Sequence, residues 1–139
     1  MISTINSFND QYEFLSNTFQ SPIEIDGISY TNAMAAYYAQ GIKDVNARKK
    51  FSRLSGFKAK IKASKAAGFV EDWEDNPMKY MELVLRAKFK DPKLKSLLFN
   101  TKGKKLLNNN TYGDEYWGIY LGKGGNRLGK LLMKIRDEE

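Results

Sequence analysis

The feature that most constrains the fold of this chain is an apolar stripe that begins behind a proline. Pro77 directly follows two residues that commonly cap helices, and the residues that then recur at helical spacing are Met81, Val84, Leu85, Lys88 and Phe89. Proline is well tolerated in a first helical turn because its missing N–H group is not needed there. The pattern therefore predicts a helix from about Pro77 to Phe89 that spans the core.

A second local signal lies between Ile23 and Tyr30, where apolar and polar residues alternate around Asp26-Gly27. Asp-Gly tolerates the positive φ angles of a tight turn, so the segment is predicted to form a β-hairpin. An alanine-rich helix is expected next, over Ala33 to Gln40, with Thr31 or Asn32 as its cap and the following glycine at its end.

Weaker patterns complete the expected fold, which is α+β: one mostly helical domain with a small antiparallel sheet. Helices are expected from Asn46 to about Leu54, from about Phe57 to Ala66, around Leu94, Leu97 and Leu98, and from about Asn126, where Leu128, Leu131, Leu132 and Ile135 form the buried side. A short turn is expected over Lys104 to Leu107, and a strand over Tyr116 to Leu121.

Composition narrows the class of protein. The 139-residue chain contains 42% hydrophobic residues, no cysteine and no histidine. This length predicts a single domain over residues 1–139. A disulfide framework and a thiolate metal site are excluded, and catalysis would have to use carboxylates, lysine, tyrosine or a ligand's own groups. No apolar run is long enough for a signal peptide or a membrane span, so a cytoplasmic protein with no membrane partner is expected.

The formal charge of +7 is unevenly distributed along the chain. Between Lys43 and Lys65 there are nine basic residues and one acidic residue, Asp44. A solvated lysine-rich surface accounts for such a segment, and so does an anionic partner. Nucleic-acid binding is the secondary interpretation, because the segment lacks the arginine and aromatic interleaving that base readout or single-strand stacking would favour.

The loop before the expected strand pairs a carboxylate, Asp114, with an indole, Trp117, next to Gly118. A carboxylate can accept hydrogen bonds from ribose hydroxyls or stabilise positive charge at an anomeric carbon, and an indole provides a flat apolar wall. The alternative is purely structural: the aspartate caps local amides and the tryptophan fills the core.

The glycine-rich segment Gly122 to Gly129 brings backbone amides to the start of a helix, where anions are favoured. It predicts a phosphate contact through these amides, with a plain glycine-rich turn that has Asn126 as its cap as the alternative. It lacks the Gly-Lys-Ser/Thr ending of a P-loop. Around the first helix, Tyr30, Tyr37, Tyr38 and Gln40 offer stacking faces and hydrogen bonds, although aromatic residues at this spacing also form ordinary core.

The order of these motifs resembles the NADAR (YbiA-like) family over nearly the whole chain, most specifically at its C-terminal end. The segments that carry the resemblance are Phe14-Leu15-Ser16-Asn17, Asp26-Gly27-Ile28-Ser29-Tyr30, Ala35-Ala36-Tyr37-Tyr38-Ala39-Gln40, Trp73, Met81, Arg86-Ala87-Lys88-Phe89, Thr101, Asp114-Glu115-Tyr116-Trp117-Gly118 and Asn126-Arg127-Leu128-Gly129 with the helix that follows.

The resemblance implies an N-glycosidase that cleaves ribose-phosphate from riboflavin-pathway intermediates or ADP-ribose from modified guanine bases. It implies no metal and no redox cofactor, and its partners would be a small nucleotide or ribose-phosphate ligand, or ADP-ribosylated nucleic acid. The ligand-binding residues carried over are Phe14, Ser16, Asn17, Tyr30, Tyr37, Tyr38, Gln40, Asp114, Trp117, Gly118, Asn126 and Arg127.

Several charged residues typical of the family are replaced in this chain. Met34 stands in place of a glutamate, Gly41 in place of a lysine, Asn108 in place of a second glutamate, and Ser64 near the position of an arginine. Two hypotheses follow. One is a divergent N-glycosidase that uses Asp114, with Lys43 substituting for the missing lysine. The other is a binding protein that keeps the fold but has lost hydrolysis, such as a sensor or sequestering protein for NAD- or ADP-ribose-derived nucleotides.

Overall fold

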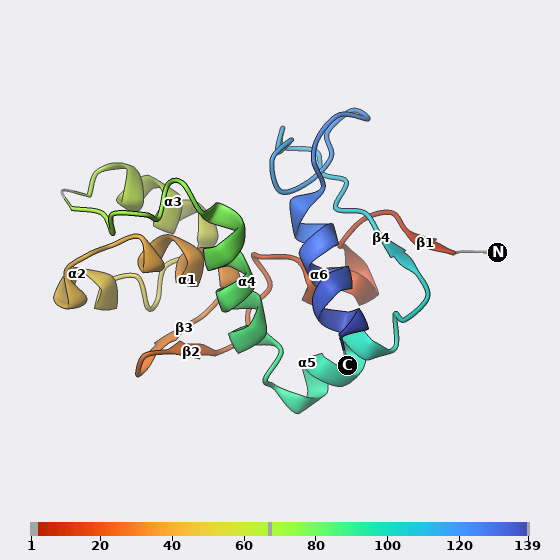
Figure 1. Cartoon of the computed structure of the whole chain (residues 1–139), viewed down its shortest axis with the longest axis horizontal. Coiled ribbons are helices and arrows are strands. Elements are labelled where there is room, and N and C mark those ends of the chain that lie inside the picture. The colour runs from red at the N-terminus through yellow and green to blue at the C-terminus, as the bar shows by residue number, and fades with distance from the viewer. Residues whose placement is uncertain (1–2, 67, 139) are drawn as a thin grey trace. The chain divides into compact units, whose positions relative to one another are not determined.

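A computed structural model describes residues 3–66 and 68–138 of the chain. Its elements, in chain order, are β1 (Thr4–Ile5), the 3₁₀ helix η1 (Asp10–Leu15), β2 (Ile23–Ile25), β3 (Ile28–Tyr30), α1 (Ala33–Gln40), α2 (Val45–Lys49), α3 (Gly56–Ser64), α4 (Pro77–Lys88), α5 (Pro92–Phe99), β4 (Lys105–Leu106) and α6 (Arg127–Asp137) (Figure 1). Helices and short strands are mixed, which confirms the predicted α+β class, and β2 and β3 form the small antiparallel sheet.

The chain divides into two compact units, one within residues 17–90 and the other within residues 1–16 and 91–139. The prediction of a single domain remains a prediction. No helix in the described part of the chain is long and apolar enough to cross a membrane.

In the unit of residues 17–90, α1 is the central element and packs against α3, α4 and the β2–β3 hairpin (Figure 1). The hairpin turns at Asp26 and Gly27, whose φ angles of 52° and 80° are both positive, as the Asp-Gly pair predicted. Asn32 begins α1 by accepting a hydrogen bond from the Ala35 N–H group at 2.8 Å. The alanines of α1 are fully buried, and small side chains let the neighbouring helices approach closely.

The two following helices differ in their limits from the prediction. Helix α2 starts at Val45 because the Asp44 carboxylate, and not Asn46, caps it through the Ala47 N–H group. Helix α3 starts at Gly56, where Ser55 caps it through Lys58. The residue that caps a helix decides where the helix starts, and an apolar pattern does not show which of several neighbouring polar residues will be the cap.

Helix α4 confirms the prediction made from the apolar stripe behind Pro77. Pro77 occupies its first turn, and its buried side contains Met81, Val84, Leu85 and Lys88. The apolar residues of this stripe are covered by α1 and β2. The stripe therefore faces the core of its own unit, as the periodicity predicted.

The other unit is built from α5, α6 and a two-stranded parallel sheet, β1 with β4. Helix α6 packs on β4 and α5 through its apolar side, and Leu128, Leu131, Leu132 and Ile135 are buried as predicted. Two predictions are wrong here: residues 105–106 form a strand instead of a turn, and residues 116–121 form no strand but only isolated bridges at Ile119 and Tyr120. A parallel pair joins segments far apart in sequence, so no local pattern announces it.

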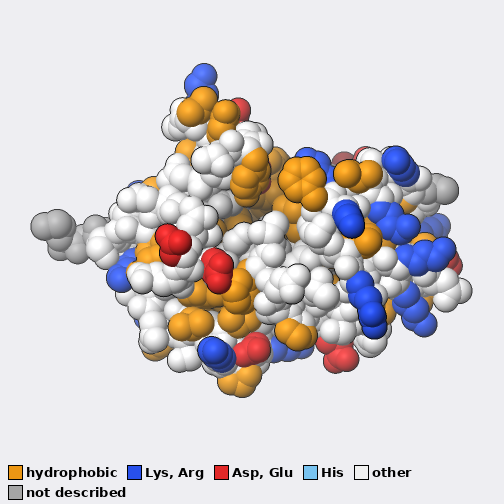
Figure 2. Space-filling model, turned by 180° about the vertical axis from the view of Figure 1, so that it is seen from behind, with side chains coloured by type: hydrophobic (Ala, Val, Ile, Leu, Met, Phe, Trp, Pro, Cys, Tyr) orange, Lys and Arg blue, Asp and Glu red, His pale blue; other side chains and the backbone are white. Residues whose placement is uncertain are grey.

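The surface charge is as uneven as the sequence predicted. Lysine and arginine side chains gather at the end of the 17–90 unit that carries α2 and α3, with exposed apolar side chains among them (Figure 2).

Candidate functional site

The predicted site residues fall into two groups, one in each unit. In the 17–90 unit, Tyr30, Tyr37 and Gln40 are buried on or beside α1, and Tyr38 is half-buried there. Asn17 joins them through its backbone, because its carbonyl oxygen accepts a hydrogen bond from the Met34 N–H group at 3.0 Å. The structure thus brings these residues together around one helix.

An aromatic cluster closes the C-terminal end of α1. The Trp73 ring centroid lies 5.1 Å from that of Tyr37, 6.1 Å from that of Tyr38 and 6.2 Å from that of Phe69, with which it is stacked. In the sequence, Trp73 was only one of the residues that carry the family resemblance. Its indole lies against Gly41, where an added Cβ atom would meet ring atom Cδ2 at 2.6 Å.

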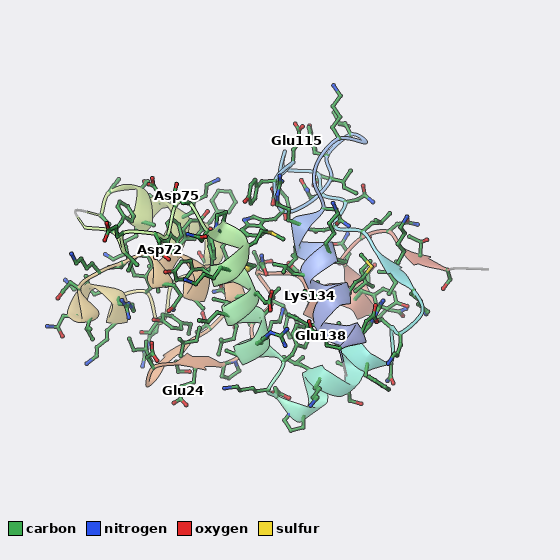
Figure 3. The ribbon with its side chains drawn as sticks, viewed as in Figure 1. Glu24, Asp72, Asp75, Glu115, Lys134 and Glu138 are labelled. Carbon is green, nitrogen blue, oxygen red and sulfur yellow. The ribbon has the colours of Figure 1, made fainter. Side chains whose placement is uncertain are left out.

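The segment that carries Trp73 is fastened to the start of α4. Asp72, labelled in Figure 3, accepts hydrogen bonds from the Tyr80 hydroxyl and, at 3.2 Å, from the Lys79 ammonium group, while its own carbonyl oxygen accepts one from Asn76. The bond from Tyr80 and then that from Lys79 hold the pKa of the Asp72 carboxyl below its usual value. This attachment positions the indole of Trp73.

Four side-chain polar atoms around α1 are buried without a hydrogen-bond partner among the described residues: Asn17 Oδ1, Ser21 Oγ, Tyr30 OH and Trp73 Nε1. Burial raises the pKa of the Tyr30 hydroxyl, and the nearby Arg48 charge and Gln40 side chain oppose this shift. The Gln40 side chain is therefore close to the Tyr30 hydroxyl, although the two form no well-aligned hydrogen bond. An unsatisfied buried polar group costs about 1–3 kcal/mol, so folded proteins rarely keep several together without a water or ligand to satisfy them. All four lie in the 17–90 unit, and they include both acceptors and donors.

Lys88 on α4 is another polar side chain of this unit, and a lysine is not expected in a hydrophobic core. Its side chain is fully buried, and its ammonium nitrogen lies 5.8 Å from the Phe19 ring centroid and 5.3 Å from that of Phe89. Burial lowers its pKa to about 7. Phe19 lies between Asn17 and Ser21 in the chain, so this amine and two of the unsatisfied oxygens belong to neighbouring parts of the unit.

Lys43, predicted as the substitute for the missing family lysine, follows α1 by three residues and its side chain is exposed. Its backbone N–H group donates to the Gly68 carbonyl oxygen at 3.2 Å, beside the bridge between Ile42 and Phe69. Its catalytic role stays a prediction.

In the other unit, the predicted residues of the 114–118 and 126–127 segments gather around the first turn of α6. Asp114 is half-buried, and its Oδ1 atom accepts hydrogen bonds from the backbone N–H groups of Tyr116 at 3.0 Å and Trp117 at 2.9 Å. This carboxylate therefore shapes the loop, and a ribose contact would have to use its second oxygen. Phe14 and Ser16 lie at the end of η1, where Phe14 is buried and Ser16 closes the helix with an N–H bond to Glu13.

The Asn126 side chain binds the start of α6 to the segment of residues 106–108. Its Oδ1 atom accepts from the Asn108 N–H group at 2.8 Å and its Nδ2 atom donates to the Leu106 carbonyl at 3.0 Å. Its φ of 48° is left-handed, a conformation that asparagine tolerates better than most residues. This side chain therefore has a structural role, and its predicted contact with a ligand stays a prediction.

The backbone amides at the start of α6 are also largely engaged. The N–H groups of Gly125, Asn126 and Leu128 donate to the carbonyl oxygens of Glu115, Gly118 and Trp117; Glu115 is labelled in Figure 3. A Cβ atom at Gly118 would meet the Asn108 carbonyl oxygen, and one at Gly124 would meet the Gly118 carbonyl oxygen. Here glycine permits close backbone packing, and phosphate binding at this turn stays a prediction.

Arg127 completes this arrangement on the exposed side. Its guanidinium carbon lies 4.0 Å from the centroid of the Tyr116 ring, and Nη1 donates to the Tyr116 carbonyl oxygen at 3.0 Å. Tyr116 in turn meets Trp117 edge to face at 4.8 Å between centroids. Trp117 is buried, so its ring serves the packing of this loop.

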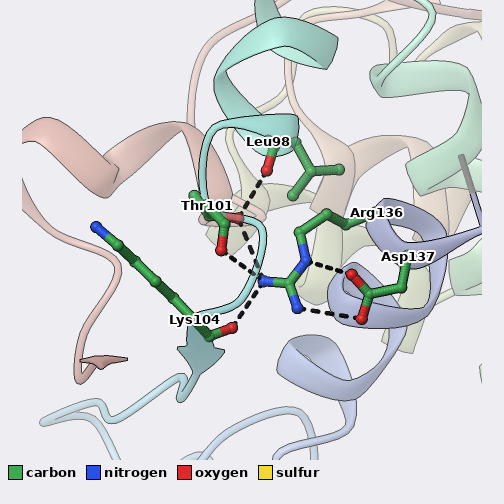
Figure 4. Close-up of polar contacts among 5 residues, drawn as sticks. All are labelled: Leu98, Thr101, Lys104, Arg136 and Asp137. Atoms are coloured by element: carbon green, nitrogen blue, oxygen red, sulfur yellow. Dashed lines mark hydrogen bonds and ion pairs between the residues drawn. The ribbon is translucent and has the colours of Figure 1, made fainter. Parts of the chain in front are cut away.

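Arg136 holds the far end of α6. Its guanidinium donates to the carbonyl oxygens of Thr101 at 3.0 Å and Lys104 at 2.7 Å, and forms an ion pair with Asp137 (Figure 4). Only 4% of the Arg136 side chain is exposed, compared with 52% of the Asp137 side chain. The buried bonds to the backbone are therefore the important ones for stability.

Two of the family departures have a packing explanation. The Met34 side chain lies against α3, where a Cβ atom added at Gly56 would meet Met34 Sδ at 3.0 Å. Asn108 is buried and donates from Nδ2 to the Trp117 carbonyl oxygen at 3.4 Å. Ser64, the fourth departure, is exposed and donates to the Ile61 carbonyl oxygen at 2.6 Å. Among the described residues there is no group of three or more aspartate or glutamate side chains that could hold a metal ion.

Sequence reasoning missed two residues of interest. Lys88 counted only as part of an apolar stripe, although a lysine at a core position of an otherwise apolar helix face is itself a signal. Trp73 was not among the predicted ligand residues, because nothing in its local sequence shows that its N–H group is buried without a partner among the described residues.

The two units define a small α+β protein with unsatisfied polar atoms buried along its first helix. The chain belongs to the NADAR family: the NADAR domain model matches residues 5–138. It is 34% identical over 136 residues to the N-glycosidase YbiA of Escherichia coli K12, an alignment that covers 95% of this chain and 84% of that protein. The NMR structure of E. coli YbiA superimposes with a TM-score of 0.83 over 99% of this chain and 86% of the other.

A more distant relative is the riboflavin biosynthesis protein VVA0006 of Vibrio vulnificus, which is 28% identical over 134 residues, or 94% of this chain and 36% of that protein. The resemblance stated from the sequence is confirmed, and with it the class of N-glycosidase relatives.

Proposed function

We propose that this protein binds a ribose-phosphate or ADP-ribose-type nucleotide and hydrolyses its N-glycosidic bond. Support comes from membership of the NADAR family and from 34% identity to a protein named as an N-glycosidase. The name of the Vibrio vulnificus relative makes nucleotides of riboflavin biosynthesis the first substrates to test.

The single structural observation that carries the proposal is the set of unsatisfied polar atoms around α1. Asn17 Oδ1 can accept a hydrogen bond from a ribose hydroxyl, and Trp73 Nε1 can only donate, so it would pair with a phosphate or hydroxyl oxygen. Tyr30 OH can do both. A ligand rich in hydroxyl and phosphate groups would form the hydrogen bonds that these atoms lack. Without such a ligand, water would have to form them.

Lys88 supplies the chemical group that a glycosidase without histidine needs. With a pKa of about 7, about half of its amines are neutral at neutral pH, and a neutral amine can act as a base. In the proposed step Lys88 Nζ takes a proton from water while the water oxygen bonds to the anomeric carbon. The bond between that carbon and the nitrogen of the leaving nucleobase breaks, and its electron pair leaves with the nitrogen. That nitrogen then takes a proton from the Lys88 ammonium group, so one water is consumed and Lys88 returns to its neutral form.

Asp114 and Lys43 remain proposed participants. An Asp114→Asn variant keeps an oxygen to accept the bonds from Tyr116 and Trp117 but removes the negative charge, so it separates a charge effect from a loss of loop structure. Lys43→Met tests the exposed lysine in the same way.

The experiment is to incubate the protein with ADP-ribose, NAD and riboflavin-pathway nucleotides and to analyse free and protein-bound species by chromatography and mass spectrometry. Free base together with ribose phosphate or ADP-ribose is the expected result. Lys88→Met should lose turnover by about 100-fold or more, the usual contribution of a general base, while ligand binding persists. Turnover by Lys88→Met at the wild-type rate would remove Lys88 from the mechanism.

A second function is favoured by the departures from the family. Met34 packs against Gly56, and Trp73 occupies the space beside Gly41, so the volumes of two expected charged side chains are filled by local packing. These observations support a nucleotide-binding protein that has lost hydrolysis. Recovery of intact ligand in stoichiometric amount, with no base released, would establish this second function and overturn the first.

A further inference from the structure

One exposed surface has no part in the proposed hydrolysis. It is the outer face of α3, named here the α3 surface, and it consists of Phe57, Lys58, Lys60, Ile61, Lys62 and Lys65. The opposite side of the helix, formed by Gly56, Ala59 and Ala63, is buried, and α3 packs on α1. The six side chains of the α3 surface therefore point away from the core.

The charge of this region is of one sign. From Val45 to Val70 the chain holds eight lysine and arginine residues and no acidic residue. Arg48 is used internally, because its guanidinium donates to the Ile42 carbonyl oxygen at 2.7 Å and 3.1 Å. The four lysines of the α3 surface are exposed (Figure 2 shows the basic end of this unit). Such a field attracts a polyanion.

Two apolar side chains stand among these lysines. Phe57 is 74% exposed and Ile61 is 52% exposed. They are four residues apart and so lie on the same side of the helix, with Lys58 and Lys62 forming a parallel pair about 6 Å apart along the axis. The sequence alone did not favour single-strand stacking by this segment, but it did not show that Phe57 is exposed beside the lysines. An exposed aromatic ring beside a row of cations is the arrangement with which proteins bind single-stranded nucleic acid, by base stacking and phosphate contacts.

We propose that the α3 surface binds single-stranded nucleic acid, with its lysines on phosphates and Phe57 stacked on an unpaired base. Double-stranded DNA fits less well, because its bases are already stacked on one another and unavailable to Phe57. An anionic membrane fits less well because a helix that lies in the lipid interface needs a continuous apolar face, and the small apolar residues of α3 are buried against the protein.

The test measures binding of a fluorescein-labelled oligo(dT) strand by fluorescence anisotropy at several salt concentrations. Two phosphate contacts should contribute about 1.4 to the slope of log K against log salt, since each contributes about 0.7 on a single strand. Lys58→Glu/Lys62→Glu should weaken binding about tenfold or more and lower this slope. The matched control is Lys93→Glu/Lys105→Glu, which changes the net charge equally at two exposed lysines of the other unit; it should retain most of the binding.

A second pair of variants tests stacking. Phe57→Ala should weaken binding about fivefold or more, as loss of one stacked base does, while Phe99→Ala, at a phenylalanine that is 48% exposed on α5, should leave it unchanged. Circular dichroism should show all variants folded. Equal binding of duplex and single strand, no effect of Phe57→Ala, or binding only to vesicles that contain phosphatidylserine would overturn the proposal. Hydrolysis of free nucleotides by Lys58→Glu/Lys62→Glu separates this surface from the proposed glycosidase function.

Discussion

The indole of Trp73 leaves no room for a side chain at Gly41. A Cβ atom at Gly41 would lie 2.6 Å from ring atom Cδ2 and 2.8 Å from Cε2. The φ of Gly41 is −79°, which any residue adopts, so the glycine is required for space and not for backbone conformation. The family's lysine at this position is thus incompatible with the indole as it stands here.

Gly41→Ala should therefore destabilise the protein by about 1–3 kcal/mol through overpacking, measured by urea unfolding. In a Trp73→Ala background the same substitution should cost little, because the obstructing ring is gone. Gly68→Ala is the matched control, since a Cβ atom there would meet nothing within 4 Å. Additive effects of Gly41→Ala and Trp73→Ala would show that the two residues are not in conflict.

The burial of Lys88 predicts a pH-dependent stability. Its pKa is about 7 in the folded protein and 10.5 when exposed to water, so between these values the unfolded chain binds more protons than the folded one. Stability should consequently rise with pH across this interval, and the cost of burying the amine should be fully present below about pH 7.

The measurement compares wild type with Lys88→Met by urea unfolding at a series of pH values. Lys88→Met should be more stable than wild type by a few kcal/mol near pH 6, and the difference should shrink towards pH 10. The comparison cancels titration of the other groups. A difference that does not change with pH would contradict a lowered pKa for this lysine.

Asn126 should be among the least replaceable residues of its unit. Asn126→Gly retains the left-handed backbone but leaves the Asn108 N–H group and the Leu106 carbonyl without their partners, at a cost of about 2–4 kcal/mol. Asn126→Ala should cost about 1 kcal/mol more because of its positive φ. Asn109→Ala, which removes an exposed bond to the Asn6 carbonyl oxygen, serves as control and should cost under about 1 kcal/mol.

Substitutions of Arg136 and of Asp137 should differ sharply in their effect on stability, although the two residues form one ion pair. Arg136→Met leaves the buried carbonyl oxygens of Thr101 and Lys104 unsatisfied and should destabilise by about 2–4 kcal/mol. Asp137→Asn removes only the charge of a partner whose side chain is 52% exposed, and should cost less than about 1 kcal/mol. Thermal unfolding of the two variants gives the comparison, and similar losses would mean that the ion pair dominates.

Much of the fold could be predicted because its signals are local. The Asp26-Gly27 turn and the cap at Asn32 depend on a few adjacent residues, and the structure confirms both. The pairing of β1 with β4 could not be predicted, since the two strands lie at distant points of the chain and each contains only two residues. The predicted strand at residues 116–121 failed because its backbone groups pair with the loops around Asn108 and Gly125.

Residue order and helical periodicity are visible along the chain, so they were enough to identify the family, the apolar stripe of α4 and the candidate ligand residues. What several of those residues do became clear only in the folded protein. The side chains of Asp114 and Asn126 form hydrogen bonds with backbone groups of their own unit. Trp73 fills the space beside Gly41, and burial lowers the pKa of Lys88 to about 7. These properties arise from burial and from contacts between segments that are distant in the chain. Neither burial nor such contacts can be predicted from a local stretch of sequence.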